Sequence, residues 1–184
     1  MWLKSQCLVQ PFCEHEPFVK VWPSSVIGLG LGLFARKHIK YLQVCAIYSG
    51  TLRRTVTGNK SLFLLGPMEY VDPTTSVTSH WYMDATDLHT GAGRWANDAC
   101  DYDGVPDHLH TNRTTNIKFR LRIAPHVHSV YLQYYVEMYA IDDIPAGREL
   151  FVAYGEKYWQ DVTKYFKGTD PMILQGVFEE ELEL

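Results

Sequence analysis

The sequence predicts a mostly β protein that ends in a short helix. Short segments rich in Val, Ile, Tyr and Phe recur between turn signals, whereas good helix signals are scarce. Hydrophobic residues make up 46% of the 184, which is enough for one well-buried domain. We therefore expect a single globular β unit.

Seven segments have the composition and length of strands. They are residues 17–22, 32–39, 43–52, 80–86, 116–124, 130–141 and 148–155. The fifth segment alternates apolar and charged residues, as a strand with one wet face does. Its inward positions are Ile117, Phe119, Leu121 and Ile123, and its outward positions are Lys118, Arg120 and Arg122.

A helix is predicted over residues 155–166, because apolar side chains recur there at helical spacing. Its apolar face consists of Tyr158, Val162, Tyr165 and Phe166. Gly168 and Pro171 end the pattern.

Composition limits the partners and the compartment. The net charge of −4, from 17 basic and 21 acidic residues, gives no general attraction to nucleic acid or to an anionic membrane. The four cysteines form no Cys-x-x-Cys pair and no signal peptide is evident, so we expect reduced thiols inside the cell, in the nucleus or the cytoplasm. No run approaches the roughly 18 apolar residues of a spanning helix.

The glycine-rich run "GLGLGLFA", residues 28–35, suggests a turn that holds a ligand. Its spacing is Gly-x-Gly-x-Gly, whereas a dinucleotide-binding loop needs Gly-x-Gly-x-x-Gly followed by a helix. The residues that follow alternate like a strand and offer no helix N-cap, which argues against a phosphate-binding loop.

Four separated pieces carry the strongest functional signal by their order and spacing. They are "GLGLFA" (30–35), "YMDAT" (82–86), "RWANDAC" (94–100) and "IDDIPAGRELFVAYGEKYW" (141–159). In this order the chain resembles the SET-domain family of S-adenosylmethionine-dependent protein lysine methyltransferases, over roughly residues 18–160. The last piece is the most specific, because it is similar to the family's closing motif of a Gly-Glu-Glu-Leu run and a Tyr-Gly pair.

The resemblance implies a SET-domain fold of small, mostly antiparallel sheets around a pseudoknot. The closing segment would be threaded beneath residues 94–100, an exception to the usual absence of knots. The resemblance also divides the chain into an N-terminal extension (1–17), the SET domain (18–160) and a helical tail that closes the substrate channel (161–184).

S-adenosylmethionine is the cofactor that the resemblance implies. Its binding residues would be Gly30, Leu31, Gly32, Tyr82, Arg94, Asn97, Asp98, Tyr154 and Trp159. The backbone around Gly30 and Gly32 would contact the methionine part, and Asn97 would hydrogen-bond the cofactor. Trp159 would pack on the adenine.

Asp98 is the main departure from the family's pattern, which has histidine after the asparagine. It would place an extra negative charge beside a cationic cofactor. An insertion over residues 101–115 also lengthens the loop before Asn116.

Methyl transfer is an in-line displacement that needs a positioned, neutral amine, whereas free lysine has a pKa of about 10.4. An aromatic channel and the cofactor's like charge would both favour the neutral amine. By resemblance Tyr154 is catalytic, and whether it also removes a proton stays open. Tyr48 matches a tyrosine that bonds the amine in some members, or is an ordinary sheet tyrosine. The channel would be lined by Tyr48, Phe119, Val152 and Tyr158.

A lysine-bearing protein or peptide, such as a histone tail, is the expected partner, with no direct contact to nucleic acid. A SET-like module without turnover, acting as a peptide-binding adaptor, is the alternative function, and a β protein that binds a small molecule or sugar is a third. No metal is expected, because the paired histidines His108, His110, His126 and His128 lack cysteine partners at ligand spacing.

Overall fold

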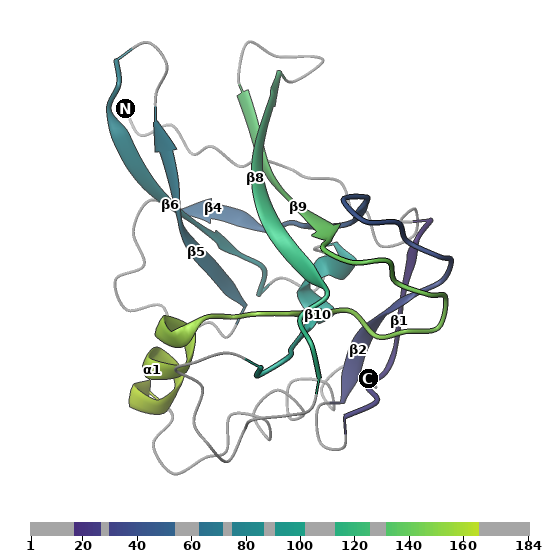
Figure 1. Ribbon diagram of the computed structural model, residues 1–184. Helices are drawn as coiled ribbons and strands as arrows, with labels where there is room; N and C mark the ends of the chain where they lie inside the picture. Colours follow the sequence, from purple (N-terminus) through teal and green to yellow (C-terminus); the bar gives the residue numbers. More distant parts are fainter. Residues whose placement is uncertain are drawn as a thin grey trace.

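The computed structural model describes residues 17–26, 30–53, 63–71, 75–86, 91–101, 113–125 and 132–165. Its elements in chain order are β1 (Val19–Pro23), β2 (Leu31–Ala35), β3 (Val44–Tyr48), β4 (Thr51–Arg53), β5 (Leu64–Val71), β6 (Thr78–Asp84), the 3₁₀ helix η2 (Ala92–Trp95), β7 (Asn97–Asp98), β8 (Ile117–Pro125), β9 (Leu132–Ala140), β10 (Phe151–Val152) and α1 (Glu156–Tyr165) (Figure 1). The prediction of a mostly β fold with a helix near the C-terminal end is confirmed.

The strands form small sheets, as expected. Three of them are antiparallel, with the strand orders β1-β2, β3-β9-β8 and β4-β6-β5. The fourth is the short parallel pair of β7 and β10. Figure 1 shows β10 at the centre of the molecule, with α1 following it.

The alternation predicted for residues 116–124 is present in β8. Ile117 is fully buried and Phe119 is half-buried, while the opposite face carries Arg120 and Arg122. Both arginines donate hydrogen bonds to the Glu137 carboxylate on β9, at 2.7 Å from Arg120 Nη2 and 3.0 Å from Arg122 Nε. The wet face of the strand is therefore an ion-pair cluster across two strands.

Residues 32–35 of strand β2 are all buried. Both edges of the strand are also paired, one with β1 and the other with the segment 147–150. The amide of Ala35 donates to the carbonyl of Arg148 (2.9 Å), and the carbonyl of Leu33 accepts from the amide of Leu150 (2.7 Å). The strand ends at Ala35, so the expected strand over residues 32–39 holds only for its first half.

The closing segment, residues 149–152, is threaded as the pseudoknot prediction requires. One of its edges pairs in parallel with β7, where Phe151 lies opposite Asn97. The other edge is held by the side chain of Asn116, whose Oδ1 accepts the amide of Phe151 (2.8 Å) and whose Nδ2 donates to the carbonyl of Glu149 (2.9 Å). The segment thus lies between β7 and Asn116.

Strand β5 was not predicted from the sequence. It contains the Gly66–Pro67 step, which is a turn signal in sequence, and the pairing with β6 shifts register between Leu65 and Met68 to accommodate it. Helix α1 falls within the predicted range, although Phe166 and the side chains of Val162 and Tyr165 lie outside what is described. Among the described residues, no helix is long and apolar enough to cross a membrane.

The Glu137 cluster predicts acid-sensitive stability. Burial alone would raise the pKa of Glu137, but the hydrogen bonds from Arg122 and Arg120 outweigh it and hold the pKa below 4.5. Because the folded state lowers this pKa, the stabilisation is fully present above about pH 4.5 and is lost as the pH falls below it. In urea titrations at several pH values, Glu137→Gln should lose part of this acid dependence. The control Glu69→Gln, at an exposed carboxylate on β5, should keep it.

Candidate functional site

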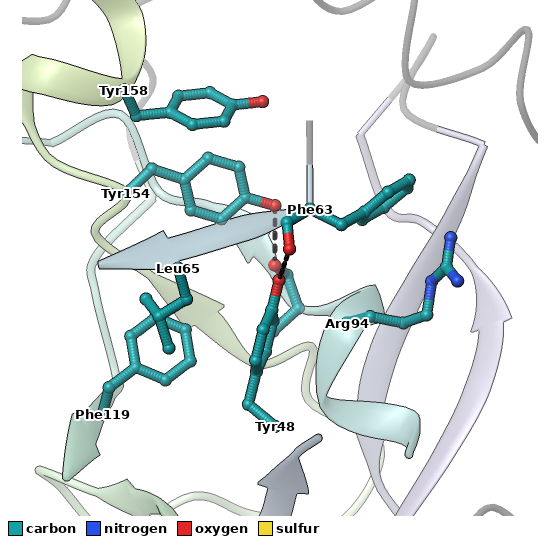
Figure 2. Close-up of a pocket in the computed structure, with 8 residues that line it drawn as sticks. Tyr48, Phe63, Leu65, Arg94, Phe119, Tyr154 and Tyr158 are labelled. Atoms are coloured by element: carbon teal, nitrogen blue, oxygen red, sulfur yellow. Dashed lines mark hydrogen bonds between the residues drawn. The ribbon is translucent and has the colours of Figure 1, made fainter. Parts of the chain in front are cut away.

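A narrow, mostly aromatic pocket of about 30 Å³ lies where η2, β3, β8 and the segment after β10 meet (Figure 2). It is lined by Tyr48, Phe63, Leu65, Arg94, Ala96, Phe119, Tyr154 and Tyr158. Five of these residues were predicted from the sequence as site residues. Residues that are far apart in sequence, from Tyr48 to Tyr158, therefore line the same pocket.

Two tyrosine hydroxyls point into the pocket and toward one another (Figure 2). Tyr48 donates to the backbone carbonyl of Phe63 (2.7 Å), and Tyr154 donates to the carbonyl of Ala96 (2.9 Å). A phenol oxygen that donates its proton in this way also carries acceptor lone pairs. The carbonyls therefore orient both hydroxyls as acceptors toward the pocket.

Two phenols of the pocket, those of Tyr48 and Tyr158, are held in their protonated form. Burial raises the pKa of Tyr48 well above its usual value, although the nearby positive charge of Arg94 acts in the opposite direction. Burial, and then the charge of Asp98, likewise raise the pKa of Tyr158. At neutral pH both side chains act as neutral hydrogen-bonding groups rather than as phenolates.

Arg94 brings a buried positive charge to the pocket wall. Its side chain is 4% exposed, and its guanidinium lies over the rings of Phe63 (4.0 Å to the centroid) and Trp95 (4.9 Å). Nη1 also donates to the carbonyl of Thr86 at 3.2 Å. The structure therefore places this predicted cofactor residue against the pocket.

Two edge-to-face ring pairs make the remaining walls. Phe119 packs on Tyr48 with centroids 5.4 Å apart, and Tyr158 packs on Tyr154 with centroids 4.6 Å apart. Such pairs favour one relative orientation of the two rings. The space between the tyrosine hydroxyls is thus bounded by rings from β8 and α1.

A second group of predicted residues gathers around the buried carboxylate of Glu149, which is 5% exposed. Its Oε1 accepts from Ser24 Oγ (2.7 Å) and Asn97 Nδ2 (3.0 Å). Its Oε2 accepts from the amide of Ser25 (2.8 Å) and from the Ser25 hydroxyl. These donors compensate for the removal of a charge from water.

The glycine-rich turn is fixed by the same carboxylate. Asn97 Nδ2 also donates to the carbonyl of Leu31 at 3.1 Å. A Cβ on Gly32 would lie 2.1 Å from Oε1 of Glu149, so the missing side chain makes room for this carboxylate. Gly30 is exposed, with a φ of 61°.

Asp98 and Trp159 bond to each other. Asp98 Oδ2 accepts from the indole Nε1 of Trp159 at 2.9 Å, and Oδ1 accepts from the amide of Cys100 at 2.9 Å. The Asp98 charge expected beside a cofactor is therefore directed toward helix α1. Burial, followed by the charge of Asp98, raises the pKa of the Cys100 thiol to about 12, so it stays protonated.

Two predicted site residues lie apart from these groups. Tyr82 lies on β6 opposite Arg53 and beside Gly66, and Val152 is buried in the core, so neither lines the pocket. The four paired histidines fall outside the described residues, and among the residues that are described no cluster of His, Cys, Asp or Glu could hold a metal ion.

Sequence reasoning missed six residues that build the two groups: Ser24, Ser25, Phe63, Leu65, Ala96 and Glu149. Ala96 and Glu149 had a signal, because each lies in a quoted motif. The others had none, because their roles come from backbone position or from contacts with distant segments.

The chain belongs to the SET-domain family, because the family model of the SET domain matches residues 30–155. No relative was found among curated proteins.

The chain is also similar to solved structures. The ctPRC2 complex in an autoinhibited conformation bound to S-adenosylmethionine aligns over 82% of this chain and 16% of its own, with 23% identity and a TM-score of 0.50. KRYPTONITE in complex with mCHG DNA and SAH aligns over 76% and 24%, with 21% identity and a TM-score of 0.47. A second polycomb repressive complex 2, from Chaetomium thermophilum, aligns over 74% and 15% at 23% identity, with a TM-score of 0.48. The chain spans less than a quarter of each.

The contact between Gly32 and Glu149 predicts coupled mutations. Gly32→Ala should lower the free energy of unfolding by about 1–3 kcal/mol, because the new methyl group overpacks the carboxylate. Glu149→Asp withdraws the carboxylate by one methylene, so the same Gly32→Ala change should cost less in that background. Denaturant titrations of the two single variants and the double variant measure this. Equal costs in both backgrounds would show that the close approach at Gly32 serves another group.

Proposed function

We propose that this protein is an S-adenosylmethionine-dependent protein lysine N-methyltransferase whose substrate lysine enters the aromatic pocket. The observation that carries the proposal is the pair of tyrosine hydroxyls, Tyr48 and Tyr154, oriented by backbone carbonyls into one narrow pocket of a SET-domain chain. The alternative, an adaptor that binds without turnover, is separated from it by the experiment below.

The pocket supports binding of a neutral amine. Its aromatic walls would disfavour an ammonium by desolvation, and the Arg94 charge that acts on Tyr48 would disfavour it further. The amine proton is lost to solvent before transfer. The two hydroxyl oxygens would then accept hydrogen bonds from the amine and direct its lone pair along the pocket.

The glycine-rich turn fits a small polar cofactor group. Gly30 presents exposed backbone without a side chain, and Asn97 anchors the neighbouring Leu31 carbonyl. We assign the methionine part of S-adenosylmethionine to this turn, as the likeness to the S-adenosylmethionine-bound ctPRC2 fold suggests. When bound, the cofactor would supply an electrophilic methyl group on a positively charged sulfur. Tyr154 would orient the amine for the in-line attack that forms the C–N bond as the S–C bond breaks.

The substrate class is a protein or peptide with an accessible lysine, for which a histone tail is the first candidate. A lysine side chain carries its amine at the end of a long, slender chain, so the amine could reach the two hydroxyls while the protein backbone stays outside. The SET domain (18–160) would carry catalysis and the C-terminal tail would close the channel.

Loss of the Tyr154 hydroxyl should abolish transfer while cofactor binding persists. Tyr154→Phe keeps the ring against Tyr158 but removes the oriented oxygen, so we expect kcat to fall by about 100-fold or more. Transfer of label to histone and bulk protein mixtures measures the rate, and calorimetry with S-adenosylmethionine measures binding. Asn97→Ala is the matched variant, which should weaken cofactor binding because it releases the Leu31 carbonyl and removes one donor from the Glu149 carboxylate.

The two measurements separate the candidate functions. Transfer of labelled methyl groups to lysine by the wild type, and its loss in Tyr154→Phe, would support the methyltransferase function. Cofactor binding with no transfer to any mixture would favour the adaptor, and wild-type protein that binds no S-adenosylmethionine would overturn the proposal.

Phe119 is proposed to set how many methyl groups the amine receives. Its ring packs on Tyr48 and lacks a hydroxyl, which leaves room for a methylated amine. Phe119→Tyr should shift products toward monomethyl-lysine, because the new oxygen would compete for that space. Mass spectrometry of the product states measures this, and identical distributions for both proteins would exclude the role.

A further inference from the structure

Helix α1 is attached to the pseudoknot by a buried, charge-assisted hydrogen bond. Asp98 and Trp159 are each 5% exposed, and the indole nitrogen donates to Asp98 Oδ2 at 2.9 Å. A hydrogen bond to a carboxylate is stronger than a neutral one, and water that would weaken it is excluded here. This contact joins β7 to a helix that begins 58 positions later, at Glu156.

Tyr154 and α1 are joined through Gly155, whose φ is +92°, a conformation that L side chains rarely adopt. The first turn is closed locally by the bond from the amide of Tyr158 to the carbonyl of Gly155 (3.1 Å). A local bond of this kind does not fix the direction in which the helix leaves.

The indole in turn positions a wall of the pocket. The ring of Trp159 meets that of Tyr158 edge-on, with centroids 5.2 Å apart and planes at 87°. Tyr158 then packs on Tyr154 at 4.6 Å and lines the pocket. A path of direct contacts therefore leads from Asp98 to the proposed catalytic hydroxyl.

We propose that Asp98 is a positioning residue that closes the substrate channel by docking α1 through the indole of Trp159. The proposal rests on the proposed function, because it treats the pocket as a lysine channel. It also gives a reason for aspartate where the family's motif has histidine: a carboxylate accepts the indole proton and the Cys100 amide at the same time.

The test compares Asp98→Asn, Trp159→Phe and the double variant. Asparagine keeps the shape but has one acceptor oxygen, so it cannot accept the indole and the Cys100 amide on its two sides at once. Phenylalanine keeps a ring but removes the donor. The control is Gln160→Ala, because Gln160 is exposed and bonds Glu156 on the same helix.

The first readout requires no activity. In ¹H–¹⁵N spectra the indole signal that disappears in Trp159→Phe belongs to Trp159, and its exchange with solvent should be slow in the wild type. Asp98→Asn should shift this signal and speed its exchange by about 10-fold or more, together with faster amide exchange over residues 156–160. Unchanged exchange in Asp98→Asn would overturn the docking role, whether or not the protein is an enzyme.

The second readout is kinetic. Each single variant should raise KM for the lysine peptide by about 10-fold while the Kd for S-adenosylmethionine stays the same, and the double variant should be no worse than either one. Additive effects would show that the two residues act independently, and a change confined to the cofactor Kd would make them cofactor residues. Either result would overturn the proposal. A wild-type protein that transfers no methyl group would refute the proposed function, and the exchange data would still decide whether Asp98 docks the helix.

Discussion

The buried carboxylate of Glu149 joins parts of the chain that are far apart in sequence. Its side chain accepts hydrogen bonds from Ser24, Ser25 and Asn97, and its backbone carbonyl accepts one from Asn116. A carboxylate in this position is stable only while its donors stay in place, because an unpaired buried charge is very costly. The turn after β1, the strand β2, the pair of β7 and β10 and the closing segment therefore depend on one another.

The threaded segment converts this anchoring into a rigid pocket. Residues 149–152 are held along both edges, so the chain leaves them in a fixed direction toward Tyr154. The Tyr154 hydroxyl then bonds the carbonyl of Ala96, next to the β7 residue that anchors Glu149. Catalytic groups gain most when they are oriented before the substrate arrives. Here the same strand pairing that closes the fold also aligns the phenol.

Local sequence patterns were sufficient for most of the fold. The alternation in β8, the helical spacing of α1 and the closing motif each led to the correct element, and the order of the motifs led to the family. The sequence did not reveal β5, because a Gly-Pro step reads as a turn. It also did not reveal the pairing of the second edge of β2, because the partner segment lies more than a hundred residues away. Tyr48, Arg94, Phe119, Tyr154 and Tyr158 were all selected as site residues and meet at the pocket. The partners of Asp98 and the filling of the space at Gly32 could not be foreseen, because both depend on tertiary contacts with residues that no motif links.

The span between Ser25 and Glu149, 124 residues, also matters while the protein is being made. At ordinary rates of synthesis, on the order of 10 s pass between the appearance of the serines and that of the glutamate. Until Glu149 has been made, Ser24 and Ser25 lack the carboxylate that they bond in the folded protein. The domain can therefore become one folded unit only after the closing segment has left the ribosome.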